Sequence, residues 1–286
     1  MENLIFFFNS LREYQFLQNA LLAGILIGAV CGIIGCFIIL RGMALMGDAI
    51  SHAVLPGVAI AYMFGVSYFI GALVSALATA LGIGWITQHS KVKNDTAIGI
   101  MFTAAFALGV VLITLRRGTG TDLWHILFGN VLAVSTADLW VIFIIGIATF
   151  MFIGLFYKQL LLTTFDPVMA QAVGLPIVKI HYALLLMLSL ITVASLKTVG
   201  IILVVAMLIT PAAAGYLLTE RISEMLLLAP AFGVISSITG VYLSYIYDTP
   251  TGASVVLVAS IIFAACLFRS TVIKRMKKIM GVSTAL

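Results

Sequence analysis

Nine long apolar segments, separated by short polar connections, dominate this sequence. Each is close to the roughly 20 residues that an α-helix needs to cross the hydrocarbon core of a bilayer. Lipid offers no partners to backbone N–H and C=O groups, so helices, which satisfy these groups internally, are the expected form. The expected spans are 17–40, 42–64, 67–88, 96–115, 138–157, 180–196, 198–218, 225–246 and 252–271. We therefore predict an all-α polytopic membrane protein with eight to nine transmembrane helices, eight if two segments merge or one lies flat.

The composition excludes a soluble fold. Of the 286 residues, 63% are hydrophobic and only 9% are charged, whereas soluble domains carry about 25% charged residues. The net charge of +5 comes from residues that flank the apolar segments, including the basic run at 269–278. Such clusters commonly meet anionic lipid at the cytoplasmic face. We therefore expect membrane lipid, and no nucleic acid, as the partner of these charges.

The distribution of Lys and Arg orients the chain, because cytoplasmic loops carry the excess of positive charge. Nine spans put the two ends on opposite sides, and we place the C-terminal end inside. Four of the fifteen Lys and Arg residues then lie outside: Arg12, Arg116, Arg117 and Lys197. We therefore expect an external N-terminal segment (1–16), a single transmembrane domain (17–271) and a cytoplasmic basic tail (272–286).

Two ionisable residues, Asp48 and His52, stand inside the second apolar segment. Positions i and i+4 share one face of a helix, so the carboxylate and the imidazole should lie side by side. If the helix begins near Gly42, His52 lies about 15 Å along it, at ~1.5 Å per residue. Ionisable groups at membrane depth are costly and usually face a protein interior, a cavity or a permeant ion. The spacing therefore makes this pair a candidate site for a divalent metal in transit.

One Asp and one His supply two or three ligand atoms, whereas a metal takes about four to six. A homodimer with its twofold axis through the pore brings two such pairs together. Oxygen and nitrogen ligands suit Mn²⁺, Fe²⁺ or Zn²⁺, and without a thiolate they disfavour Cu⁺. The alternative is that Asp48 and His52 only bond each other or a neighbouring helix.

Three residues around the pair are expected to shape the pore helix. Pro56 follows His52 by four positions, so it cannot donate to the His52 carbonyl and favours a bend. Gly47 and Gly57 flank the motif and leave room for another backbone. In the first span, Gly24, Gly28 and Gly32 recur every four residues, a spacing that favours close helix packing within the chain.

The connection at 158–179 is the longest on the expected cytoplasmic side. Asp166 and Pro167 are a helix-start signal, and Gly174 with Pro176 is a stop signal. The short helix between them would be marginal in water on its own. It is either a connector lying on the bilayer or a coupling helix that grips a cytoplasmic partner.

The sequence contains no phosphate-binding GxxxxGK[ST] loop, no GxSxG elbow and no HExxH motif. We therefore expect a transport subunit rather than an enzyme, with no permanently bound cofactor. Asp122 and His125, three residues apart on the outer side, are weaker candidates for metal or partner contact, and residues 122–134 are expected to form a partial or surface helix. Cys31, Cys36 and Cys266 lie in apolar runs and are expected to be buried small hydrophobic residues.

The run RGMALMGDAISHAVLPGVAIAYMFG at 41–65 resembles the signature of the ABC-3 permeases, the membrane subunits of bacterial metal-ion importers driven by ATP-binding cassette (ABC) ATPases. Four further runs are similar to that family: FALGVVLI at 106–113, LFGNVLAVS at 127–135, FDPVMAQAVGL at 165–175 and TVGIILVVAMLITPAAAGYLL at 198–218. The similarity covers about residues 14–270.

The resemblance implies an ABC importer permease bundle in a bacterial cell membrane. It implies a homodimer that works with a cytoplasmic ABC ATPase dimer, which hydrolyses ATP, and with an extracellular metal-binding solute-binding protein. It places the transported metal on Asp48 and His52. It also makes about 165–175 a coupling helix that docks in the ATPase. The residues that match this segment are Phe165, Asp166, Pro167, Met169, Ala170, Val173 and Gly174.

The leading hypothesis is therefore the permease of an ABC importer for a divalent metal. Manganese is favoured because the motifs resemble the manganese permeases most. A zinc or iron(II) permease of the same family is the first alternative, since this ligand set accepts all three ions. An ATPase-independent secondary transporter, in which Asp48 relays an ion, is the second.

Overall fold

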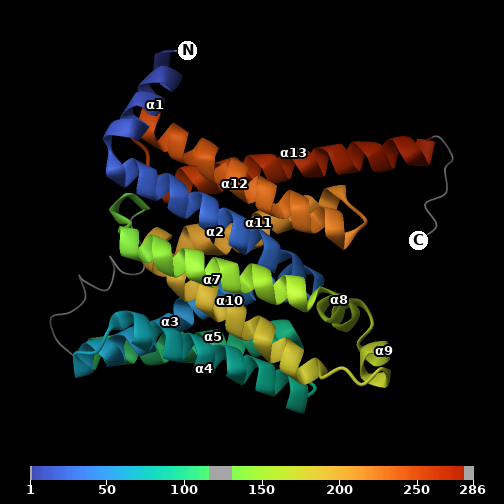
Figure 1. Cartoon of the computed structure of the whole chain (residues 1–286). Helices are drawn as coiled ribbons and strands as arrows, with labels where there is room; N and C mark the ends of the chain where they lie inside the picture. Colours follow the sequence, from blue (N-terminus) through green and yellow to red (C-terminus); the bar gives the residue numbers. More distant parts are fainter. Residues whose placement is uncertain (1, 116–130, 280–286) are drawn as a thin grey trace.

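The computed structural model describes residues 2–115 and 131–279. This part of the chain contains helices and no strand (Figure 1). The helices long and apolar enough to cross a membrane are α2 (Gln15–Leu40), α3 (Met46–Phe64), α4 (Tyr68–His89), α5 (Asn94–Leu115), α7 (Thr136–Leu155), α10 (Ile177–Val199), α11 (Ile201–Leu218), α12 (Ile222–Tyr247) and α13 (Thr251–Ile279). In α13, the candidate span is the part Thr251–Ile273. The all-α fold with nine spans is thus confirmed within the described residues. The expected partial helix at 122–134 falls mostly outside them, and its end is the short 3₁₀ helix η1 (Val131–Ala133).

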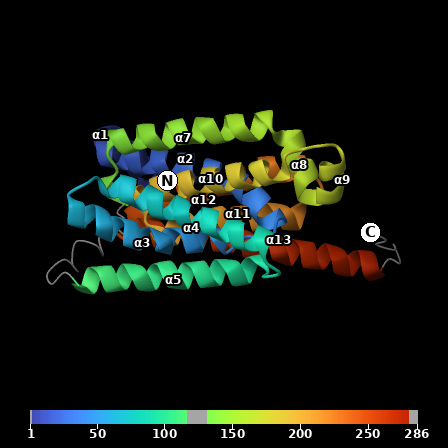
Figure 2. The same cartoon turned by 90° about the horizontal axis from the view of Figure 1, so that it is seen from below.

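Helix α2 is the centre of the bundle. It packs against α12, α11 and α7, and Phe37 and Ile34 are among its fully buried side chains. Figure 1 shows α12 and α13 on one side of α2 and α3, α4 and α5 on the other, with α7 and α10 between the two groups. Helix α11 packs on α2, α12 and α13. Helix α5 lies at the edge (Figure 2) and buries few of its residues. It packs on α3 and α4.

Close packing of α2 on α12 depends on the glycines that recur every four residues. A Cβ atom on Gly28 would lie 2.7 Å from the backbone of Gly233, and one on Gly32 would lie 2.8 Å from the backbone of Pro230. One turn before the Gly28 contact, the Ser237 hydroxyl donates to the Gly24 carbonyl at 2.8 Å. Small residues let helix backbones approach closely in lipid, so this glycine row serves packing within the chain.

The α2–α3 connection is a tight turn, which places the start of α3 later than the sequence suggested. Gly42 has a positive φ of 66°, and its N–H and that of Met43 donate to the carbonyls of Ile39 and Ile38. A glycine in this conformation commonly ends a helix. Helix α3 therefore begins at Met46 rather than near Gly42.

Two short helices, α8 (Tyr157–Phe165) and α9 (Pro167–Ala172), connect α7 to α10. The predicted short helix is α9. Its first turn is capped by the Asp166 carboxylate, which accepts from Met169 N–H at 2.8 Å, and Gly174 has a φ of 80°. We call this end of the bundle the α9 end; the C-terminal ends of α2 and α13 lie there as well (Figures 1 and 2).

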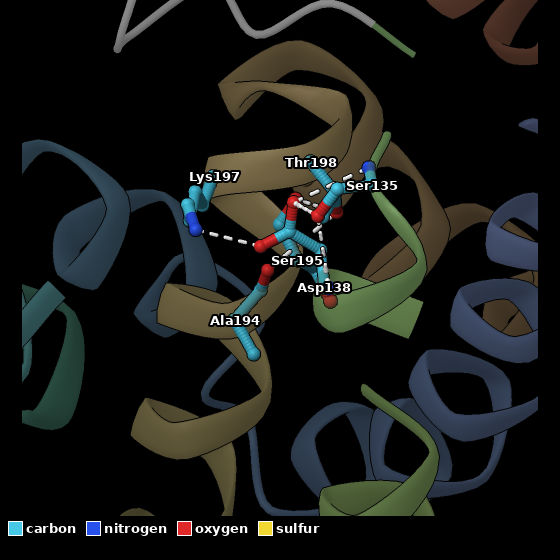
Figure 3. Close-up of polar contacts among 6 residues, drawn as sticks. All are labelled: Ser135, Asp138, Ala194, Ser195, Lys197 and Thr198. Atoms are coloured by element: carbon cyan, nitrogen blue, oxygen red, sulfur yellow. Dashed lines mark hydrogen bonds and ion pairs between the residues drawn. The ribbon is translucent and has the colours of Figure 1, made fainter. Parts of the chain in front are cut away.

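At the opposite end, Asp138 fastens α7 to α10. Lys197 Nζ of α10 donates to Asp138 Oδ1 at 2.6 Å, and Ser135 Oγ donates to Asp138 Oδ2 at 2.6 Å (Figure 3). The Asp138 N–H donates to Ser135 Oγ at 3.2 Å and the Ser135 N–H donates to Asp138 Oδ2 at 3.4 Å, and these two bonds form a capping box for α7. The N-terminal segment at this end forms a helix, α1 (Glu2–Glu13), in which Phe7 packs edge to face on Tyr242 of α12.

Candidate metal site

Asp48 and His52 lie one turn apart on α3, as the sequence predicted. Asp48 Oδ1 and His52 Nε2 are 3.5 Å apart, and the two side chains are 41% and 30% exposed, respectively. Because α3 begins at Met46, His52 lies about 9 Å along the helix, at ~1.5 Å per residue, and not at the expected 15 Å. The pair is therefore nearer the α9 end of the bundle than the sequence suggested.

The separation of the two atoms suits a shared metal ion better than a direct hydrogen bond. An N–H···O bond spans about 2.7–3.2 Å, and 3.5 Å is longer than that. Two ligand atoms that each lie about 2.1 Å from one ion are roughly 3.0–3.4 Å apart at angles of 90–110°.

Two phenylalanines of α5 line the imidazole. The His52 ring lies 5.4 Å from Phe102 and 5.7 Å from Phe106, measured between ring centroids, with interplanar angles of 62° and 87°. Such edge-to-face contacts restrict the orientation of a ring. Sequence reasoning missed these residues. Their spacing of four on an apolar span was the available signal, but it looks the same for a ring that faces lipid.

The glycines and the proline of the motif have distinct positions. A Cβ on Gly57 would overlap the carbonyl oxygen of Gly71, so this glycine lets α4 approach α3 closely. A Cβ on Gly47 would lie 2.7 Å from Leu208 Cδ1 of α11. Pro56 is buried and borders an apolar groove of about 600 Å³ between α3, α4 and α5. Gly57 therefore sets the distance between α3 and α4 near the pair, whereas at Gly47 only the end of a leucine side chain would have to move.

A third ligand is not supplied by the part of the chain that the structure describes. Within residues 2–115 and 131–279, no group of three or more His, Cys, Asp and Glu side chains comes together. The three cysteines are buried as predicted. The Cys36 thiol donates a hydrogen bond to the Gly32 carbonyl at 3.2 Å. Asp122 and His125 lie outside the described residues. The pair on α3 is thus open and incomplete as a metal shell.

A second surface with functional character lies on α8 and α9. Apolar side chains there are exposed: Phe165 (62%), Val168 (79%), Met169 (51%) and Val173 (59%). Ala170, by contrast, is fully buried and holds α9 on the bundle. Exposed apolar patches of this kind mark interaction sites.

Comparison with known proteins places this geometry in context. The profile described as "ABC 3 transport family" matches residues 13–270. The chain is 67% identical to the manganese transport system membrane protein MntC of Halalkalibacterium halodurans, over 94% of this chain and 92% of that protein. It is 42% identical to a probable iron transport system membrane protein of Haemophilus influenzae, over 91% and 96% of the two chains. A solved structure described as PsaBC from Streptococcus pneumoniae in complex with Fab superposes with a TM-score of 0.81 at 46% identity, over 92% of this chain and 95% of that one.

Proposed function

This chain belongs to the ABC 3 transport family, and from that membership we propose that it is the membrane permease subunit of an ABC importer that carries manganese into the cell. The assignment of manganese as the substrate rests on the similarity to a manganese transport protein over nearly the whole length of the chain. The chain is a transport subunit, and the ion is its cargo rather than a resident cofactor.

Asp48 and His52 bind the ion during its passage. Their Oδ1 and Nε2 atoms are close enough to share one metal, and both side chains reach the surface of the single chain. A carboxylate oxygen and an imidazole nitrogen form a ligand set that Mn²⁺ accepts.

A second copy of the chain completes the metal shell. The open pair offers too few ligands for an ion that takes four to six. A twofold axis next to α3 brings a second Asp48 and a second His52 to the same ion. Gly47, Pro56 and Gly57 shape the helix on which this shared site depends.

Coupling to ATP hydrolysis takes place at α8 and α9. A cytoplasmic ABC ATPase dimer supplies the hydrolysis, and the exposed Phe165, Val168, Met169 and Val173 side chains dock against it. Asp166, Pro167 and Gly174 fix the ends of α9, and Ala170 anchors it. Transport then requires that the two access states hold the ion with unequal affinity.

The orientation follows from this docking. The α9 end and the basic tail (272–286) face the cytoplasm, and the N-terminal segment (1–16) faces outward, with 17–271 as the transmembrane domain. This arrangement agrees with the excess of Lys and Arg on the α9 side. A metal-binding solute-binding protein delivers the ion from outside a bacterial cell membrane.

Purified chain reconstituted in liposomes, with and without its ATPase partner, tests the proposal. Mn²⁺ uptake should require the ATPase, ATP and a solute-binding protein together. Mn²⁺ flux through the chain alone would instead favour an ATPase-independent secondary transporter.

The similarity to an iron transport protein supports Fe²⁺ as an alternative substrate. The same ligands also suit Zn²⁺. Competition between Mn²⁺, Fe²⁺ and Zn²⁺ in the same liposomes decides among them. We expect a tenfold excess of Fe²⁺ or Zn²⁺ to reduce Mn²⁺ uptake. At equal concentrations of the three ions, Mn²⁺ should be the ion taken up most. Greater uptake of Fe²⁺ or Zn²⁺ under those conditions would reassign the substrate.

A further inference from the structure

Arg41 connects the α2–α3 turn to α8. Its Nε donates to Thr164 Oγ1 at 3.0 Å, and its Nη2 donates to Thr163 Oγ1 at 2.8 Å. The two threonines are adjacent in the last turn of α8, more than a hundred residues away in the sequence. The planar guanidinium can make both bonds at once because its donors are held in a fixed fork.

The threonine hydroxyls are oriented to accept from this guanidinium. Thr163 Oγ1 and Thr164 Oγ1 each lie within donating distance of the Leu160 carbonyl, at 3.2 and 2.6 Å. A hydroxyl has one hydrogen to donate and two lone pairs to accept with. Because its hydrogen is used on Leu160, each oxygen is left to face the arginine.

The contact is partly shielded from water. Thr163 is buried, at 6% exposure, and Leu160 is fully buried. Burial lowers the pKa of Arg41 to about 10, so the guanidinium still carries its charge at neutral pH. Losing the hydroxyls would leave a charged donor without partners, which is costly in a shielded place.

The positions of the bonded residues in the chain give the contact its significance. On one side, the Arg41 backbone ends α2, and Met43 and Met46, at 3% and 0% exposure, hold the turn that leads into α3 and to Asp48. On the other side, Asp166 follows Thr164 by two residues and caps α9. One side chain thus joins the turn that precedes α3 to the last turn of α8, which precedes α9.

We propose that Arg41 is a positioning residue for coupled transport: through Thr163 and Thr164 it makes α8 and the N-terminal end of α3 move as one unit. The inference rests on the proposed function, since it needs α9 to be displaced by an ATPase. When α8 and α9 shift, the Arg41 fork displaces the α2–α3 turn and changes the position of Asp48 relative to its ligand partners. Coupling requires a structural element with two arrangements whose equilibrium is shifted both by the metal site and by the ATPase-docking site. Here that element is the unit formed by α8 and the α2–α3 turn.

Four variants of the permease, in complex with its ATPase and supplied with ATP and the solute-binding protein, test this inference in liposomes. Arg41→Gln removes the fork. Thr163→Val with Thr164→Val removes the acceptors and keeps the side-chain shape. Thr163→Ser with Thr164→Ser keeps the hydroxyls, and Arg12→Gln removes an exposed arginine of α1, at the opposite end of the bundle, as a matched control for charge. For each, the Mn²⁺ imported per ATP hydrolysed and the equilibrium binding of Mn²⁺ to the detergent-purified complex are measured.

We expect the import ratio to fall at least about fivefold in Arg41→Gln and in the double valine variant, because hydrogen bonds to a charged group are among the stronger ones. Mn²⁺ binding should stay within about twofold of the unmodified protein. The double serine variant and Arg12→Gln should keep the unmodified ratio. A purely structural anchor would lower import and hydrolysis together and leave their ratio unchanged.

An unchanged ratio in either Arg41→Gln or the double valine variant overturns the inference, and so does a loss in the double serine variant equal to that in the valine variant. If Arg41→Gln does not assemble, the valine and serine pair decides alone. Absence of ATP-driven Mn²⁺ import by the unmodified complex would be a different result, because it refutes the proposed function itself.

Discussion

The imidazole of His52 and the phenyl ring of Phe106 lie edge to face, with centroids 5.7 Å apart and planes at 87°. This contact brings α5, an apolar span that otherwise buries little, into the environment of the candidate metal site. Nε2 of His52 points toward Asp48 in the same arrangement. The orientation of the ligand nitrogen therefore depends on a residue that carries no ligand atom.

Phe106→Ala should weaken Mn²⁺ binding without unfolding the chain. An aromatic pair contributes about 0.5–1.5 kcal/mol beyond its buried area, which corresponds to a roughly two- to tenfold loss of affinity. Titration calorimetry on the purified protein measures the change. Phe143→Ala on α7 is the control, because that ring is similarly exposed and packs on Trp140. Equal effects of the two variants would separate Phe106 from the site.

Asp48→Ala should abolish Mn²⁺ uptake while leaving assembly intact, since the half-exposed side chain contributes a ligand rather than core packing. Changes in the groups that merely support a metal ligand cost about 10–100-fold in affinity, so removal of the ligand itself should cost at least as much. His52→Ala should act likewise. Uptake is followed with isotopic Mn²⁺, and Asp95→Asn, an exposed carboxylate at the start of α5, should transport normally. Normal uptake by Asp48→Ala would refute the site.

Gly57→Ala should destabilise the bundle, because the added Cβ meets the Gly71 backbone, which cannot move aside as a flexible side chain would. Overpacking of this kind costs about 1–3 kcal/mol. Thermal unfolding in detergent reports it as a lower Tm. The matched control is Gly99→Ala on α5, where a Cβ meets nothing within 4 Å and the better helix propensity should raise stability by about 0.5–1 kcal/mol. A Tm for Gly57→Ala at or above that of Gly99→Ala would show that α3 and α4 are not held at this distance.

Val168→Asp should weaken binding of the ATPase to the permease. The valine is 79% exposed in the single chain, so the substitution leaves the fold alone but places a charge in the proposed interface. Loss of a central apolar contact costs about 2 kcal/mol or more, or roughly 30-fold in affinity. Surface plasmon resonance with the purified ATPase measures this, and Gln171→Glu adds a charge to a polar position of the same helix as a control. Binding of the ATPase to Val168→Asp as tight as to the unmodified permease would exclude Val168 of α9 from the interface.

The fold class could be predicted from the sequence, because lipid offers no hydrogen-bond partners to the N–H and C=O groups of the backbone. Long apolar segments have to be helices. The nine candidate spans among the described residues coincide with the nine expected spans to within a few residues. The short α9 was equally accessible, since Asp166, Pro167 and Gly174 are local signals that act through the few residues next to them. The start of α3 was not, because the turn at Gly42 depends on hydrogen bonds back to α2.

The candidate site divides in the same way. The relation of Asp48 to His52 is a property of helix periodicity, so four positions of sequence were enough to place them on one face. The rings around His52, the Gly57–Gly71 contact and the bonds of Arg41 to Thr163 and Thr164 join helices that are far apart in the sequence. In a uniformly apolar chain, hydropathy does not distinguish a side that faces lipid from a side that faces another helix. The sequence by itself therefore determined which segments are long and apolar enough to span the membrane and that Asp48 and His52 share one face of a helix, whereas the tertiary structure alone decided which helices meet and what surrounds that pair.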